Sequence, residues 1–119
     1  MTSLSGPSST PPKREGRRYL RCHLDTRVLV HVFRSGSTNS IWGRTSELGE
    51  DGLSATLTGT LEPTEVVSLE FQLPMSTEPM KLRAVVRYRD GFRHGFEFLT
   101  LSEQQRTVLQ RALNILPTS

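Results

Sequence analysis

The sequence predicts an all-β domain, a small antiparallel barrel or sandwich of six short strands followed by one C-terminal helix. Three observations support this prediction. Apolar and polar residues alternate over several short stretches. Clusters of Gly, Pro, Ser and Asp separate these stretches, and the spacing of about ten residues is typical of small antiparallel folds. Over residues 102–116 the apolar spacing changes to that of an amphipathic helix.

Six stretches carry the strand pattern. The clearest has an apolar face and a mostly basic face, with Met80, Leu82, Ala84, Val86 and Tyr88 on the first and Lys81, Arg83, Val85, Arg87 and Arg89 on the second. Asp90-Gly91 directly follows it and is a strong signal for a tight hairpin. The strands are expected at residues 28–32, 39–48, 52–58, 67–73, 80–89 and 92–98.

The C-terminal helix has a recognisable start and stop. Ser102 and Gln105 form a capping box, in which each side chain bonds the backbone amide of the other residue. Pro117 ends the helix. We expect this helix to cover an open end of the barrel with its apolar face, made of Val108, Leu109, Ala112, Leu113 and Leu116.

The charge of the chain is concentrated at its N-terminal end. The 119 residues suit one domain, in which we expect a disordered tail at 1–12, a basic arm at 13–21 and a folded part at 22–116. Residues 1–21 hold five bases and one acid, whereas residues 22–119 hold ten bases and eleven acids. A nearly neutral body with a basic arm indicates an anionic partner; a solvated linker is the alternative.

The sequence offers no chemistry for an enzyme or a cofactor. His23, His31 and His94 are far apart and lie in no zinc-binding motif, so we expect no metal. Cys22 and His23 are adjacent and would point to opposite faces of a strand. There is no apolar run for a membrane span and no signal peptide, and Cys22 is the lone cysteine, which favours a cytoplasmic protein.

Two short motifs stand out, one in the basic arm and one at the turn after the second predicted strand. In the arm, Arg17 and Arg21 have the spacing RxxxR. At the turn, the chain reads Glu47-x-Gly49-x-x-Gly52. In this order the pair resembles the two-part signature of PilZ domains, whose second part is [DN]xSxxG.

The resemblance extends over residues 14–116, since the later strands and the terminal helix follow in register. PilZ domains are receptors of the bacterial second messenger cyclic diguanylate (c-di-GMP). The resemblance therefore implies a six-stranded antiparallel β-barrel with a C-terminal helix, and c-di-GMP as ligand. The residues implied in ligand binding are Arg14, Arg17, Arg18, Arg21, Glu47, Gly49 and Gly52.

The chemistry of c-di-GMP suits these residue types. A guanidinium forks two donors onto a phosphate or a guanine edge, and a carboxylate on the facing turn accepts from guanine. Here Glu47 is one methylene longer than the family's Asp, and Gly49 lacks the serine hydroxyl. Because one neutral hydrogen bond contributes about 0.5–1.5 kcal/mol, the departure predicts weakened rather than abolished binding.

Two further side chains near the turn have less specific expectations. Trp42 is expected in the core or at the barrel rim rather than as a platform for a base. Arg44 is expected as a solvent-exposed strand residue, with a position facing the ligand as the alternative.

The favoured function is a non-catalytic c-di-GMP receptor whose N-terminal arm becomes ordered on the ligand and changes the surface offered to a protein partner. One alternative is a ligand-independent adaptor of pilus or motility machinery, as for PilZ-like proteins without working motifs. The other alternative is a nucleic-acid-binding barrel. The basic row at residues 81–89 argues against it, because aromatic residues do not interleave this row.

Overall fold

The computed structural model describes residues 21–119, so the expectations for the tail and for Arg14, Arg17 and Arg18 lie outside the described residues. Seven strands precede one helix. In chain order they are β1 (Arg21–His23), β2 (Arg27–Arg34), β3 (Ser37–Gly49), β4 (Gly52–Leu57), β5 (Val66–Phe71), β6 (Met80–Asp90), β7 (Arg93–Phe98) and α1 (Glu103–Ile115).

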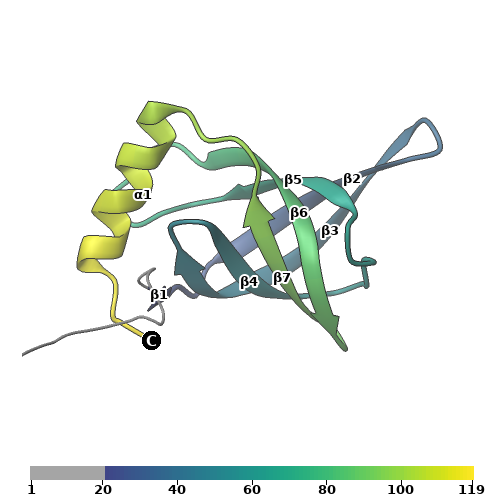
Figure 1. Cartoon of the computed structure of the whole chain (residues 1–119), viewed down its shortest axis with the longest axis horizontal. Coiled ribbons are helices and arrows are strands. Elements are labelled where there is room, and N and C mark those ends of the chain that lie inside the picture. The colour runs from purple at the N-terminus through teal and green to yellow at the C-terminus, as the bar shows by residue number, and fades with distance from the viewer. Residues whose placement is uncertain (1–20) are drawn as a thin grey trace, which may run out of the picture.

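Six of these strands close into a barrel (Figure 1). The order around it is β3-β2-β5-β6-β7-β4, every neighbouring pair is antiparallel, and β4 pairs with β3 to complete the ring. The prediction of a six-stranded antiparallel barrel with a C-terminal helix is confirmed. β1 adds a short strand beside β3, with Cys22 opposite Leu48; its three residues are too few to show an alternation.

The core lies inside the barrel and beneath the helix. Inward-facing residues of all six barrel strands are buried, and Leu109, Ala112 and Leu113 of α1 complete the same cluster. Figure 1 shows α1 packed across one end of the barrel, as the sequence predicted. The capping box is present, with Ser102 and Gln105 each accepting from the other's backbone amide.

Two β-bulges change which side chains face outward. In β3 the register with β4 shifts between Thr45 and Glu47, and in β6 the register with β7 shifts between Val86 and Tyr88. An extra residue reverses the alternation that follows it. The expected inward position of Tyr88 is therefore wrong: its ring is 43% exposed and lies against Gly95 on the outer wall.

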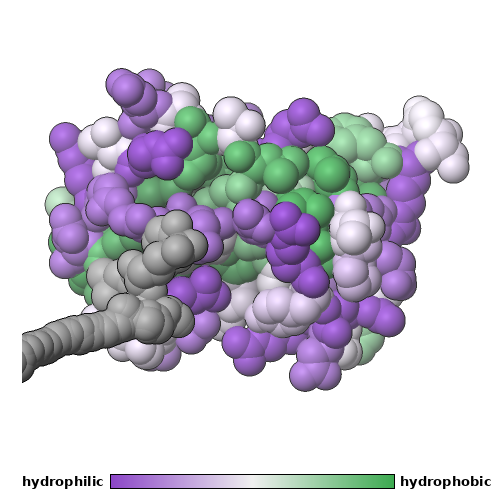
Figure 2. All heavy atoms as spheres, in the orientation of Figure 1, coloured by the Kyte–Doolittle hydropathy of each residue, from purple (hydrophilic) through white to green (hydrophobic). Residues whose placement is uncertain are grey.

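The outer wall also carries apolar side chains within the row predicted to be basic. Val85 of β6 pairs with Val66 of β5, and it is nearly buried although it faces outward. Phe33 and Leu99 are exposed near this pair in the sheet register. Figure 2 shows the resulting apolar surface on the barrel wall that faces the viewer.

His94 is a buried polar side chain that joins β7 to the loop before β5. Its Nδ1 lies 2.9 Å from the carbonyl oxygen of Phe92, and its Nε2 accepts from the amide of Leu61 at 3.0 Å. Both nitrogens are satisfied when Nδ1 carries the only proton. Burial lowers the pKa of His94, so the folded protein holds the ring neutral.

Because folded His94 is held neutral, we expect the free energy of unfolding to depend on pH. Below about pH 6.5 the unfolded chain protonates this imidazole, whereas folded His94 takes up a proton only at lower pH, so the free energy of unfolding falls as pH falls. The loss is up to about 1.4 kcal/mol for one pH unit. Urea unfolding at several pH values measures this loss.

His94→Leu should lower the free energy of unfolding by about 1–3 kcal/mol at neutral pH, because the Leu61 N–H is left unpaired. This variant should also lack the extra acid sensitivity. An identical pH slope in both proteins contradicts this account.

Candidate ligand-binding site

Arg21, the second arginine of RxxxR, is the first residue of β1. Its backbone is held from two sides. On one side it pairs with Gly49 at the end of β3. On the other, its carbonyl oxygen accepts from the amide of Ser119 at 3.0 Å, and the amide of His23 donates to Pro117 at 2.7 Å. The strand thus includes the last residue of the expected arm, and Arg21 projects from a fixed position.

The bulge in β3 brings the second motif to the same face. After the bulge, Leu48 points into the core beside Cys22, so Glu47 and Gly49 lie on the outer side with Arg21. The guanidinium of Arg21 lies 3.7 Å from the carboxylate of Glu47 and 3.9 Å from that of Asp51. The structure therefore brings Arg21 of the first motif next to Glu47 of the second, while Arg17 lies outside the described residues.

The two motif glycines differ in what the fold requires of them. Gly52 begins β4 opposite Glu97, and a Cβ there would lie 2.0 Å from the carbonyl oxygen of Phe96. Only glycine permits this approach of β4 to β7. Gly49 is not among the positive-φ glycines, which are Gly36 and Gly91, so its φ angle does not require glycine.

A cleft of about 250 Å³ opens beside Arg21. Its walls combine Arg21 and the turn before β4 with side chains from β6 and β7, three of which sequence reasoning missed: Arg87, Tyr88 and Glu97. The bulge in β6 turns Tyr88 outward, where Arg87 and the ring of Tyr88 adjoin the cleft.

The charged side chains that line the described part of the cleft are balanced, with Arg21 and Arg87 against Asp51 and Glu97, and the carboxylate of Glu47 lies beside Arg21. Arg87 donates to Glu97 at 2.5 Å, and Arg21 lies between Glu47 and Asp51. All of these groups are partly exposed, so the ion pairs are weak and exchangeable. An anionic ligand would have to replace carboxylates as partners of these two arginines.

Two side chains near the motif lie away from the cleft. Trp42 was expected in the core or at the rim, but its ring is 47% exposed on the outer face of β3, with the Arg27 guanidinium 4.5 Å from the ring centre. The extended β2–β3 hairpin places it there, since Gly43 takes the inward position beside it. Arg44 is exposed, as predicted, and donates to Asp25 at 2.8 Å.

Residues 21–119 form no group of three or more His, Cys, Asp or Glu side chains placed to hold a metal ion. Over the same residues, no helix has the length and apolar character needed to cross a membrane.

Comparison with known proteins gives the same family as the motifs. Residues 13–114 match the model of the PilZ domain. An uncharacterized protein of Aquifex aeolicus (strain VF5) is 30% identical over 100 residues, which cover 82% of this chain and 47% of that protein. The chain therefore spans about half the length of that relative.

Solved structures share the fold at low sequence identity. The PilZ domain of CeSA from a cellulose-synthesizing bacterium matches with a TM-score of 0.61 and 21% identity, over 79% of this chain and 94% of that one. The Bacillus subtilis inhibitor of motility (MotI/DgrA) matches with a TM-score of 0.66 and 18% identity, over 85% of this chain and 51% of that one. The PilZ domain of Escherichia coli YcgR, solved with c-di-GMP, matches with a TM-score of 0.66 and 20% identity, over 86% of this chain and 92% of that one. With its family model matched over most of its length, the chain belongs to the PilZ domain family.

Proposed function

We propose that this protein is a cytoplasmic c-di-GMP receptor that binds its ligand in the cleft beside Arg21. The observation that carries the proposal is the position of Arg21, which lines the cleft together with Gly52 of the second motif and lies 3.7 Å from the carboxylate of Glu47. PilZ domains are generally non-catalytic receptors, and the structure of the YcgR domain contains c-di-GMP.

Each wall of the cleft suits one part of the ligand. Arg21, together with Arg17 from the segment before β1, forks onto a phosphate or a guanine edge. Glu47 accepts from the N–H groups of guanine. The exposed ring of Tyr88, seated on Gly95, offers a flat surface to a base. Gly52 lets β4 lie close to β7 at this wall, because no side chain stands between the two strands.

In this proposal the ligand also acts on the chain before β1. Both arginines of the described cleft already lie beside carboxylates, so the basic residues of 13–20 supply the positive charge that two phosphates require. Their closure over the ligand would alter the surface next to β1 and the cleft. A protein partner that recognises only one of the two surfaces then responds to c-di-GMP.

Restoring the family residue at Gly49 tests the proposal at the second motif. Gly49→Ser adds back the hydroxyl, and the φ angle there does not require glycine. We expect c-di-GMP to bind up to about tenfold more tightly, with Glu47→Asp adding to the gain. Titration of 15N-labelled protein measures the affinity and locates the ligand through the amide signals of Arg21, Gly52 and Glu97. Signals that move only outside the cleft would refute this placement.

A ligand-independent adaptor remains the second candidate. The altered second motif and the carboxylates already beside Arg21 favour it. Nucleic-acid binding has less support, because two arginines of the basic row have carboxylate partners: Arg87 pairs with Glu97, and Arg89 lies 3.9 Å from Glu62.

A further inference from the structure

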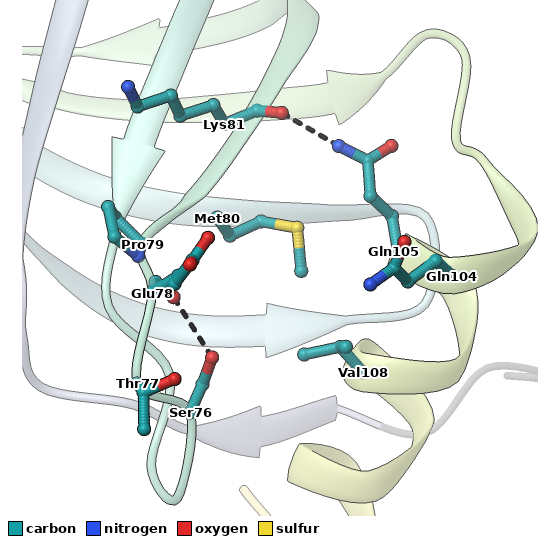
Figure 3. Close-up of a pocket in the computed structure, with 9 residues that line it drawn as sticks. All are labelled: Ser76, Thr77, Glu78, Pro79, Met80, Lys81, Gln104, Gln105 and Val108. Atoms are coloured by element: carbon teal, nitrogen blue, oxygen red, sulfur yellow. Dashed lines mark hydrogen bonds between the residues drawn. The ribbon is translucent and has the colours of Figure 1, made fainter.

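A groove runs along α1 on a different side of the molecule from the cleft. It consists of two adjoining hollows of about 620 and 550 Å³ that share Ser76, Thr77 and Val108. One wall is α1 and the other is the loop of residues 74–79 between β5 and β6. Figure 3 shows the first hollow, with Val108 of the helix and Met80 of the strand pointing into the space between the two walls. We call this feature the helix groove.

The rims of the helix groove carry apolar side chains that the fold leaves in water. Met75 is 90% exposed, on a backbone with a φ of +64° that side-chain-bearing residues rarely adopt. Ile115, on the last turn of α1, is 53% exposed. Neither side chain contributes to the core, so both are available to a partner.

The helical wall has a regular pattern. Val108, Arg111 and Ile115 line the groove and lie three and four residues apart, which places them on one face of α1. Val108 and Ile115 are separated by about 10 Å along the axis, with the cation of Arg111 between them. Among residues 21–119 no carboxylate forms an ion pair with Arg111, whereas Arg34, Arg44 and Arg87 each have one.

The loop wall favours a helical over an extended partner. The Gln72 side-chain amide donates to the carbonyl of Ser76, and the Ser76 hydroxyl donates to the carbonyl of Glu78 at 2.9 Å. Gln105 of α1 donates to the carbonyl of Lys81 at 2.7 Å (Figure 3). Because these carbonyl groups already have donors, the loop offers little free backbone for a strand to pair with.

We infer that the helix groove docks an amphipathic helix of a partner protein. Its chemistry is complementary to α1: two large apolar side chains two turns apart, which pack against Val108 and Ile115, and a carboxylate between them that pairs with Arg111. Met75 closes over the same apolar face from the loop. This docking does not depend on c-di-GMP binding.

The same helix contacts the second motif from another face. The side chain of Gln110 donates to the carboxylate of Glu50, in the turn between Gly49 and Gly52. The residues after α1 hold β1 through Pro117 and Ser119. The groove and the candidate ligand site thus share one rigid element.

Synthetic peptides test the docking directly, with the full chain and without nucleotide. The acidic peptide is a helix of about 15 residues with two Leu seven positions apart and Glu midway between them; the basic peptide has Lys in place of Glu. We expect the acidic peptide to shift amide signals of residues 74–81 and 104–115 and to bind about fivefold more tightly than the basic peptide. Arg111→Glu should reverse that order.

Arg106→Glu is the matched control, because Arg106 is exposed on α1 but does not line the helix groove. This variant should still bind the acidic peptide more tightly than the basic peptide. Equal affinities for both peptides, shifts confined to other surfaces, or no binding at about 1 mM would overturn the inference. A further result would also overturn the inference: the protein sediments with phosphatidylglycerol vesicles, Arg111→Glu abolishes this sedimentation, and neither peptide binds. The face would then be assigned to a membrane.

Discussion

Replacing Gly52 with alanine is expected to lower the free energy of unfolding by about 3 kcal/mol. The added Cβ would lie 2.0 Å from the backbone oxygen of Phe96. A backbone atom cannot rotate away as a side chain can, so β4 and β7 must separate at this pair. Urea unfolding measures the loss.

Gly59→Ala provides the control for that measurement. A Cβ at Gly59 would make ordinary contacts with Ile41 at 3.6 and 3.7 Å, so this variant should stay within about 0.5 kcal/mol of the wild-type protein. A Gly52→Ala protein as stable as the control would show that the strands adjust at no cost. The last glycine of the motif would then have no structural role.

Arg21→Ala is expected to weaken c-di-GMP binding by about 1.5–3 kcal/mol, the range for hydrogen bonds to charged groups. Its effect on stability should stay below about 1 kcal/mol, because its contacts with Glu47 and Asp51 are long, partly exposed ion pairs. Calorimetric titration and thermal unfolding measure the two quantities separately. We expect Arg17→Ala to weaken binding in the same way.

Arg44→Ala is the matched control for Arg21→Ala. Arg44 is also an exposed strand arginine with a carboxylate partner, Asp25, but it does not line the cleft. It should leave c-di-GMP binding unchanged. If both variants bind like the wild-type protein, Arg21 is not a ligand contact.

Much of the fold follows from local pattern. Alternation located the six barrel strands, and the capping box located the start of α1, because both signals need only a few neighbouring residues. The bulges in β3 and β6 were not predictable, since a bulge is defined by the partner strand. Arg87 and Tyr88 read as opposite faces of one strand until pairing with β7 shows the shift.

The candidate site also combines features that local pattern indicates with features that depend on long-range strand pairing. The two motifs indicated Arg21 and Gly52, which line one cleft, and Glu47, which lies beside Arg21. Glu97 belongs to a strand paired to β4 from far along the sequence, and no local pattern reports that pairing. Trp42 was expected in the core or at the rim, and it lies outside the core because the β2–β3 pairing turns it outward against Arg27.

Calorimetric titration of the unmodified chain with c-di-GMP, at low and at high salt, tests the receptor assignment most directly, with GTP and cyclic AMP as controls. We expect saturable binding of c-di-GMP and no binding of the controls. Its affinity should fall as salt rises, because salt screens the pairing of phosphates with exposed arginines. No heat of binding at high micromolar c-di-GMP would contradict the receptor function and leave the adaptor in its place.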